Sequence, residues 1–329
     1  THFFKGLSLI AMPIVLLLLA YTLAQGTTIE GANASRWIRL PLVGFTFQTS
    51  TLASVVLMIY VARYLTKIKD KDIHFKESIL PLWLPVFLVV ILILPANFST
   101  AAIIFFMVLL LCFMGGYPMK YLMGIVVTGL VSLTLFVLVA KAVPDVFPNR
   151  VDTWISRVES FWNPEDTEAD YQIEKAKIAI ATGGIVGSGA GKSVMKNFLP
   201  QSSSDFIYAI IVEEYGLIGG FAIMFFYLLL LFRIVVVANG SSSVFGKLLV
   251  VGVGLPIVFQ ALINMAVAVE LFPVTGQTLP LISSGGTSIW MTCLAIGIVL
   301  SASNKNIEEE ENASELDETN PLEVLSGQL

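Results

Sequence analysis

The sequence predicts an all-α integral membrane protein, a polytopic helical bundle of eight spans with a large structured outer loop. Its 329 residues are 56% hydrophobic and 13% charged, whereas a soluble domain carries about a quarter charged residues. The mean hydropathy of +0.83 agrees with a membrane protein. A bilayer span needs about 20 mostly apolar residues, and they must be helical because lipid offers the backbone no hydrogen-bond partners.

Eight apolar stretches meet the length of a span. They lie near residues 7–24, 47–64, 79–95, 99–116, 121–140, 206–232, 247–268 and 286–303. The third and fourth stretches together can also be read as one broken hairpin. We therefore predict a single transmembrane domain over residues 1–303. We find no internal repeat that would favour an inverted-repeat transporter.

Charged residues predict which ends face the cytoplasm. If residue 1 is cytoplasmic, the short inner segments hold ten Lys and Arg residues, and the short outer loop 25–46 holds only Arg36 and Arg39. This is the positive-inside bias, so both ends should be cytoplasmic and residues 141–204 should form a large extracytoplasmic loop. Residues 304–329 contain eight acids and almost no aromatic residue, which predicts a disordered acidic cytoplasmic tail.

The two cysteines predict neither a disulfide framework nor a zinc site. Cys112 and Cys293 lie inside apolar stretches and far apart in the sequence, so we expect small core hydrophobes. The net charge is −5, and no nucleic-acid partner is expected. Thr1 is not an initiator residue, so we expect a fragment or a processed form.

The outer loop 141–204 is longer than a connection needs to be, which is typical of a functional loop. Between residues 150 and 162, apolar and aromatic residues recur at helical spacing and charged residues fill the other face. Trp154 belongs to the apolar face and Arg157 to the charged face. This pattern predicts a helix in the membrane interface, with its aromatic side chains among the lipids. An acidic turn, an Ile/Ala-rich stretch at 171–181 and a glycine cluster follow.

Part of the glycine cluster, Gly187 to Ser193, looks like a nucleotide-binding P-loop. The motif requires a glycine where Val186 stands, and an outer loop offers neither ATP nor the strand-to-helix scaffold. Two interpretations remain. The segment is either a flexible turn or a cradle of backbone amides that binds an anion with help from Lys192 and Lys196.

Asp205 stands at the mouth of the stretch 206–232. With Ser202 it fits a capping box, and an acid in a first helical turn suits the helix dipole. The other interpretation is a general base at the lipid–water boundary. Both can hold at once, because a cap would fix the position of the carboxylate.

Glu213 and Glu214 lie deeper in the same stretch, where an unpaired charge is costly and indicates function. At about 1.5 Å per residue, Glu213 would lie roughly 12 Å from Asp205. Paired glycosidase carboxylates are only about 5–9.5 Å apart. We therefore expect a structural or pathway role for the two glutamates.

Several motifs together resemble the SEDS family, the shape, elongation, division and sporulation proteins. They are Gly31-Ala-Asn-Ala-Ser-Arg36-Trp37, Phe47-Gln48, Phe161-Trp-Asn-Pro, Tyr171-Gln172, Ala179-Ile-Ala-Thr-Gly183-Gly184, Ser193-x-x-Lys196, Leu199-Pro200, Asp205-Phe-Ile-Tyr-Ala-Ile-Ile-Val-Glu213-Glu214-Tyr-Gly216 and Thr275-Gly276-Gln-Thr-Leu279-Pro280-Leu-Ile-Ser283-Ser-Gly285-Gly286. The resemblance covers residues 7–303 approximately. The compact segment from Gly187 to Leu199 is similar to the FtsW division branch, whereas the RodA elongation branch usually carries a longer version.

The resemblance implies ten spans, of which this chain would lack the first two. It also implies a multi-pass enzyme of the bacterial inner membrane, at the division septum, that polymerises lipid II into peptidoglycan glycan strands. Asp205 would be the catalytic residue, and Arg157, Gln172, Lys196 and Ser204 would bind substrate. Arg36, Glu213 and Glu214 would have structural or pathway roles.

The implied chemistry suits these residue types. A carboxylate can take the proton of an acceptor 4-hydroxyl while the oxygen attacks the anomeric carbon of a sugar pyrophosphate. Arg157, Lys196 or a divalent cation, Mg²⁺ or Mn²⁺, would stabilise the leaving pyrophosphate. The implied partners are lipid II, a class B penicillin-binding protein transpeptidase and other divisome membrane proteins.

Five positions depart from the family pattern. Thr51 and Ser54 stand where the family often has Glu and Lys, Asn97 where it has an acid, Ser203 where it has His and Gln201 where it has Glu. The joint loss of one cation and two anions indicates a buried network that was replaced as a unit. Two other functions stay open, a lipid II flippase and a non-catalytic divisome scaffold.

Overall fold

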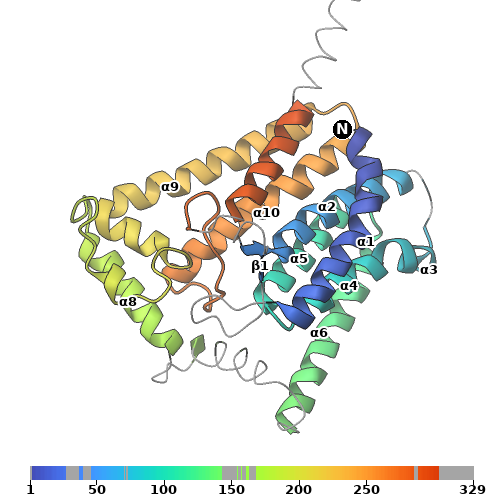
Figure 1. The fold of residues 1–329 in the computed structure, drawn as a ribbon. Coiled ribbons are helices and arrows are strands. Elements are labelled where there is room, and N and C mark those ends of the chain that lie inside the picture. The colour runs from blue at the N-terminus through green and yellow to red at the C-terminus, as the bar shows by residue number, and fades with distance from the viewer. Residues whose placement is uncertain are drawn as a thin grey trace, which may run out of the picture.

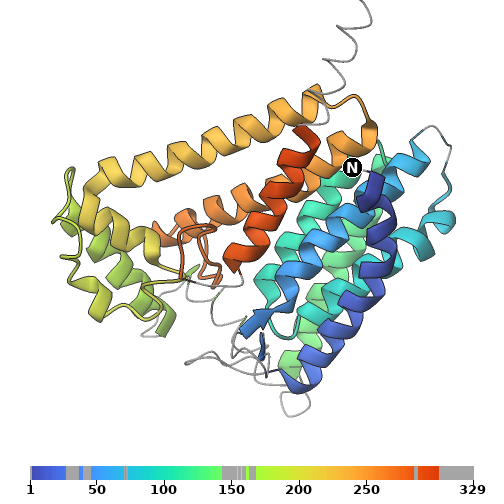
Figure 2. The ribbon, with the colours of Figure 1, turned by 45° about the horizontal axis from the view of Figure 1, so that its top comes forward.

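A computed structural model describes residues 2–26, 37–39, 46–69, 71, 73–142, 154, 157, 161–162, 168–284 and 288–303. These residues form a helical bundle with a lobe on one side (Figures 1 and 2). The bundle contains α1 (His2–Gln25), α2 (Thr49–Ile68), α3 (Phe75–Ser78), the π-helical turn η1 (Ile79–Trp83), α4 (Leu84–Ile93), α5 (Phe98–Met114), α6 (Met119–Ala142) and α10 (Val244–Ala268). The lobe contains α8 (Glu168–Gly183), the 3₁₀ turn η3 (Met195–Asn197) and the start of α9 (Ile207–Gly240).

Two short strands and one further helix complete the described elements. β1 (Trp37–Arg39) pairs antiparallel with β2 (Thr46–Gln48), with Trp37 opposite Gln48. The last helix spans Ser288–Ser303. Arg36, which directly precedes β1 in the sequence, lies outside the described residues.

Every one of the eight predicted apolar stretches forms a helix. Six described helices are long and apolar enough to cross a membrane, namely Phe4–Gln25, Thr49–Ile68, Phe75–Ile93, Met119–Val139, Ile207–Gly240 and Val244–Ala268. Phe98–Met114 and Ser288–Ser303 are apolar but shorter. The stretch that could be read as one broken hairpin forms separate helices, α4 and α5. The predicted class, a helical membrane bundle, is confirmed, and the number of spans stays a prediction.

The core of the bundle lies around α10, which packs against α2, α5 and α9. Among the six described helices that could cross a membrane, α10 is the most buried and α6 the least buried. A Cβ at Gly252 would lie 2.8 Å from Leu111, and a Cβ at Gly254 would lie 2.9 Å from Ile234. These glycines therefore permit close helix crossings, which are typical of membrane bundles because van der Waals packing holds their helices together.

The predicted stretch 206–232 is not one continuous helix. Gly216 has φ 69° and ψ −172°, and α9 turns there from a short first segment into a long second one (Figures 1 and 2). A break frees backbone groups, which lipid cannot satisfy. Residues 183–191, which we call the glycine segment, satisfy them. The backbone N–H of Ser188 donates to the carbonyl of Glu213 at 3.0 Å, and the N–H of Leu217 donates to the carbonyl of Gly184 at 2.9 Å.

Glycines let these two backbones approach each other. A Cβ at Gly187 would lie 2.2 Å from the carbonyl oxygen of Glu214, and a Cβ at Gly216 would lie 2.2 Å from that of Ile185. Both glycines also have positive φ, 89° and 69°. This contact lies between residues 183–189 and 212–218. It joins the end of α8 to the break in α9 and so holds the lobe together.

The ends of the helices agree with the predicted topology. The start of α1, the turn between α9 and α10 and the end of the last helix lie at the same end of the bundle, whereas α8 lies away from it (Figures 1 and 2). If the chain crosses the membrane an even number of times between the start of α1 and the end of the last helix, these two points must lie at the same end of the bundle. Which end faces the cytoplasm stays a prediction.

Candidate active site

Asp205 lies in a turn that leads into α9. Its backbone N–H donates to the carbonyl of Gln201 at 3.1 Å, and α9 begins at Ile207 without a side-chain cap. The predicted capping box is therefore wrong. Ser202 Oγ donates instead to the carbonyl of Lys196 at 3.1 Å, because the turn places this hydroxyl beside the 3₁₀ turn η3.

Two polar neighbours fix the position of Asp205. Ser204 Oγ donates to Gln201 Oε1 at 2.7 Å and lies 3.2 Å from Asp205 Oδ1. From α10, Asn264 Nδ2 donates to the backbone carbonyl of Asp205 at 2.7 Å. The side chain of Asp205 is half-buried. The carboxylate therefore sits on a fixed backbone beside a hydroxyl group.

The segment after α10, residues 274–284, wraps around the same turn. Ser283 Oγ donates to the carbonyl of Ser204 at 2.6 Å, and it accepts from the N–H of Leu279 at 2.7 Å. Ser284 Oγ donates to the carbonyl of Ser203 at 2.9 Å. The C-terminal motif of the sequence thus forms one wall of the site around Asp205.

Arg157 approaches this wall from the outer loop. Its Nη1 lies 3.5 Å from the carbonyl oxygen of Val274. Gly276 follows, with φ +64°, and a Cβ placed there would lie 3.5 Å from Asp205 Oδ2 and 4.0 Å from Arg157 Nη1. An acid and a guanidinium group, which are 48 positions apart in the sequence, therefore converge on a residue that has no side chain.

One described residue of the predicted interfacial helix, Trp154, contacts the bundle. Of the predicted interfacial helix at 150–162, the structure describes Trp154, Arg157, Phe161 and Trp162. Trp154 is half-buried, and its ring packs against Phe98 of α5 with the ring centroids 5.2 Å apart. Trp154 therefore has an aromatic partner on α5, and its depth among the lipids stays a prediction. Trp162 is 75% exposed, as expected of an interfacial residue.

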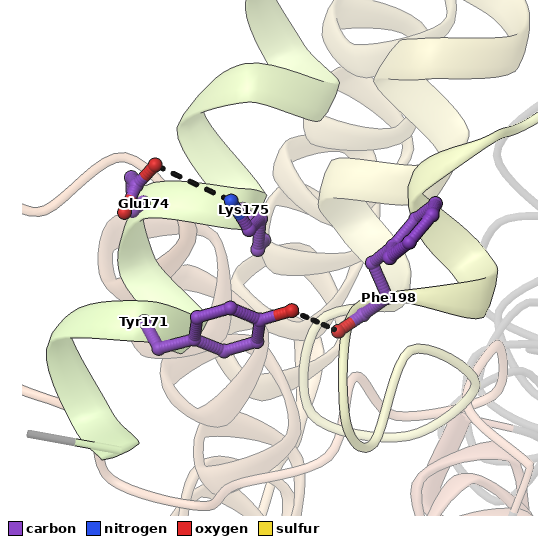
Figure 3. Close-up of polar contacts among 4 residues, drawn as sticks. All are labelled: Tyr171, Glu174, Lys175 and Phe198. Carbon is purple, nitrogen blue, oxygen red and sulfur yellow. Dashed lines mark hydrogen bonds and ion pairs between the residues drawn. The ribbon is translucent and has the colours of Figure 1, made fainter.

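The other residues predicted to bind substrate lie on the lobe. Gln172 is half-buried on α8. Beside it, the Tyr171 hydroxyl donates to the carbonyl of Phe198 at 3.3 Å, and Lys175 lies over the Tyr171 ring (Figure 3). The exposed Lys196 donates from Nζ to the carbonyl of Gly191 at 3.0 Å. The structure thus brings Arg157 and Ser204 to Asp205, whereas Gln172 and Lys196 line the lobe.

Glu213 accepts hydrogen bonds from residues 193–195, at the end of the predicted anion cradle Gly187 to Ser193. The buried carboxylate accepts from the hydroxyl of Ser193 and from the N–H groups of Val194, at 2.9 Å, and of Met195, at 3.3 Å. Glu214 accepts from the N–H of Ser193 at 3.3 Å. The two glutamates hold the glycine segment onto α9. The Ser193 hydroxyl and the amides of Val194 and Met195 thus form a cradle for the chain's own carboxylate. Anion binding by the segment Gly187 to Ser193 stays a prediction.

The positions that depart from the family pattern make local contacts. The buried Asn97 caps α5, with Oδ1 accepting from the N–H of Thr100 at 3.1 Å. Thr51 Oγ1 donates to the carbonyl of Gln48 at 2.8 Å, and Ser54 is half-buried. Because these contacts are separate, the replacement of one network as a unit stays a prediction.

Three polar residues that support the turn of Asp205 were not predicted from the sequence, namely Asn264, Gln277 and Ser283. Asn264 carried a readable signal. It stands four residues after Gln260 in an apolar stretch, so both amides share one helix face. Polar groups inside a span are functional candidates.

The described residues offer few protein ligands for a divalent cation. Among the described residues, no group of three or more His, Cys, Asp or Glu side chains could hold a metal ion. Asp205 is the carboxylate at the Gly276 wall. One carboxylate does not make an all-protein site, but Mg²⁺ is often held by one or two carboxylates together with substrate phosphates.

Comparisons with known proteins agree with this architecture. A family model described as cell cycle protein, for FtsW, RodA and SpoVE, matches residues 1–308. A probable peptidoglycan glycosyltransferase FtsW from Geobacter sp. (strain M18) is 34% identical over 297 residues, which are 88% of this chain and 76% of the relative.

Solved structures share the fold. One, from work on the coordination of polymerization and crosslinking by a peptidoglycan synthase complex, has a TM-score of 0.72 at 28% identity and covers 93% of this chain and 83% of its own. The rod shape determining protein RodA of Thermus thermophilus has a TM-score of 0.62 at 25% identity, over 92% of this chain and 79% of its own. The match along nearly the whole sequence shows that this chain belongs to the FtsW/RodA/SpoVE family of cell cycle proteins.

Proposed function

We propose that this protein is a peptidoglycan glycosyltransferase that polymerises lipid II into glycan strands during septal cell-wall synthesis. The name of the Geobacter relative supports the activity, and the polymerization named for the structural neighbour agrees with it. In this chain, one observation carries the assignment: Asp205 Oδ2 and Arg157 Nη1 lie 3.5 and 4.0 Å from the position of a Cβ at Gly276, a residue with no side chain of its own.

Asp205 is the general base of the proposed reaction. The proton of the acceptor 4-hydroxyl moves to the Asp205 carboxylate while the hydroxyl oxygen forms a bond to the anomeric carbon of the donor. The bond from that carbon to the pyrophosphate oxygen breaks, and the lipid pyrophosphate leaves. The Ser204 hydroxyl, 3.2 Å from Asp205 Oδ1, helps to orient the carboxylate, which must reach the acceptor proton at hydrogen-bond distance.

Arg157 stabilises the leaving group. Negative charge grows on the pyrophosphate as the bond breaks, and a planar guanidinium can donate two parallel hydrogen bonds to phosphate oxygens. We assign Gln172 and Lys196 to the more distant parts of the lipid-linked substrate, because both lie on the lobe that flanks the turn of Asp205. A bound Mg²⁺ or Mn²⁺ would add positive charge at the pyrophosphate, with Asp205 as its candidate protein ligand.

The structural neighbour also supports a partner. Its complex couples polymerization to crosslinking, and crosslinking of peptidoglycan is transpeptidase chemistry. We therefore propose a class B penicillin-binding protein as the partner, in an assembly with other divisome membrane proteins. The proposed location is the inner membrane at the division septum.

One experiment separates the enzyme from its two rivals. The full chain is purified, reconstituted into vesicles with fluorescently labelled lipid II, and the products are analysed on a gel while the label in each leaflet is followed. We expect glycan polymers. Movement of lipid II between leaflets without polymers would support the flippase, and neither product, with the transpeptidase present, would support the scaffold.

A further inference from the structure

A buried asparagine connects the proposed base to the core of the bundle. Asn264 of α10 is 1% exposed. Its Nδ2 donates at 2.7 Å to the carbonyl of Asp205 and, also at 2.7 Å, to the carbonyl of Gln277. One amide group therefore joins the turn before α9 to the segment after α10, two parts of the chain that are more than 70 positions apart.

The contact continues from Gln277 to α5. Gln277 Nε2 donates to Thr100 Oγ1 at 2.9 Å, and the N–H of Thr100 donates to Asn97 Oδ1 at 3.1 Å. Phe98, which follows Asn97, packs against the ring of Trp154. Trp154 stands three positions before Arg157 in the sequence. The start of α5 is thus linked to both groups that converge on Gly276.

The Asn264 amide uses its NH₂ group for both hydrogen bonds and leaves its oxygen without a partner among the described residues. Both bonds to backbone carbonyls use the NH₂ group, so the reversed amide would point its oxygen at two other oxygens. The side-chain oxygen is buried and has no hydrogen-bond partner among the described residues. An unpaired buried acceptor costs free energy, and an apolar residue would avoid that cost. The two donated bonds must therefore offset it.

We infer that Asn264, Gln277 and Thr100 form a brace that positions Asp205 for catalysis. The brace consists of these three side chains and the carbonyls of Asp205 and Gln277. Because Asn264 touches only the backbone of Asp205, it is a positioning residue and not a catalytic one. The inference rests on the proposed function, since it assigns the brace to the reaction that Asp205 performs.

Gln260 provides a matched control on the same helix face. Its Nε2 donates to the carbonyl of Thr278 at 2.9 Å and contacts Thr278 Oγ1 at 3.2 Å. Gln260 therefore holds the same segment, one helical turn away, without touching Asp205. If the amides only hold the segment after α10 in place, Asn264→Leu and Gln260→Leu should have similar effects.

The test is a double-mutant cycle between Asn264 and Asp205, measured with labelled lipid II and the purified full chain. Asn264→Leu should lower kcat by about 10- to 10²-fold, as expected when a catalytic group moves by an ångström, with KM little changed. Added to Asp205→Asn, the same change should lower the residual rate by no more than about 2-fold, because groups that act as a unit are not additive. Equal losses in both backgrounds would overturn the brace.

Thr100 keeps the inference testable if Asn264→Leu does not fold. Thr100→Val removes the hydroxyl that accepts from Gln277 at constant shape, whereas Thr100→Ser retains it. The Val variant should lose kcat and the Ser variant should recover it. Equal activity of the two variants would contradict the brace.

A readout without turnover separates this inference from the proposed function. Amide hydrogen exchange in residues 201–206 should rise in Asn264→Leu and stay unchanged in Gln260→Leu. Unchanged exchange in both would overturn the brace whatever the activity. Full activity of Asp205→Asn would instead reject the proposed base while leaving the exchange result standing.

Discussion

At the scale of single residues, the site depends on a position without a side chain. Gly276 has φ +64°, and a Cβ there would lie between Asp205 Oδ2 and Arg157 Nη1, at 3.5 and 4.0 Å. Neither distance is a clash. A methyl group would therefore be tolerated by the fold but would occupy the space where substrate must meet both groups.

Gly276→Ala should consequently lose activity out of proportion to stability. A left-handed alanine costs about 1–2 kcal/mol. Gly116, with φ +79° and nothing within 4 Å of an added Cβ, is the matched control, because Gly116→Ala adds the same strain far from Asp205. Thermal unfolding and lipid II polymerisation are measured on both. Comparable activity of the two variants would show that Gly276 does not border the substrate.

Arg157→Lys tests the role of the guanidinium group. Lysine keeps the charge but loses the planar fork that grips two phosphate oxygens. We expect a loss of kcat/KM for lipid II of about 10-fold or more, since such a bidentate charged contact contributes about 1.5–3 kcal/mol, with little change in the melting temperature. A variant that melts early yet turns over normally when cooled would assign Arg157 to loop stability instead.

At the scale of elements, the buried carboxylate of Glu213 organises the lobe. It accepts bonds from Ser193, Val194 and Met195, so the glycine segment is ordered by a residue of α9. Residues 196 to 205 follow directly and lead to the proposed base. We therefore expect a defect in the Glu213 contacts to disturb the position of Asp205.

Glu213→Gln should loosen the glycine segment. The new NH₂ group would face backbone N–H groups, leaving buried donors unsatisfied at about 1–3 kcal/mol each. Glu214→Gln is the control, because Glu214 is less buried and accepts one longer bond, 3.3 Å from the N–H of Ser193. Limited proteolysis should cut residues 184–200 faster in Glu213→Gln only. Equal cutting of both variants would remove Glu213 from this role.

The helices could be predicted because lipid requires long apolar segments, whereas the break in α9 depends on contacts between distant residues. A span must be apolar and long, and that requirement is visible locally, so every apolar stretch forms a helix. The break at Gly216 was not visible, because the apolar pattern continues through it and its freed groups pair with residues 184–189. The Ser202 capping box failed for a local reason, since the Ser202 hydroxyl donates to the backbone carbonyl of Lys196, six positions earlier.

The site shows the same division. Asp205 and Arg157 could be named from motifs, but their meeting at Gly276 depends on how a loop, a turn and the segment after α10 fold together. Asn264 was missed because one amide in an apolar helix gives a weak signal. Paired with Gln260 four residues earlier, it marks a polar face on the most buried candidate span.

At the scale of the whole molecule, the proposed partner gives a further test. Much apolar surface of α6 and α9 is exposed within the described chain, as expected of lipid-facing helices or of a contact with another span. Purification from membranes in mild detergent should recover a class B penicillin-binding protein with this chain. Repeated recovery of the chain alone, from cells that contain the complete divisome, would contradict the proposed complex.

The central claim is that Asp205 takes a proton from the acceptor hydroxyl. Asp205→Asn preserves the size of the side chain and the backbone contacts of the turn but removes the base. The most direct measurement is the rate of glycan polymerisation from labelled lipid II by the purified variant, with correct folding verified by its melting temperature. We predict a fall of at least about 10²-fold, whereas a correctly folded variant that polymerises lipid II at a near-normal rate would exclude Asp205 as the base.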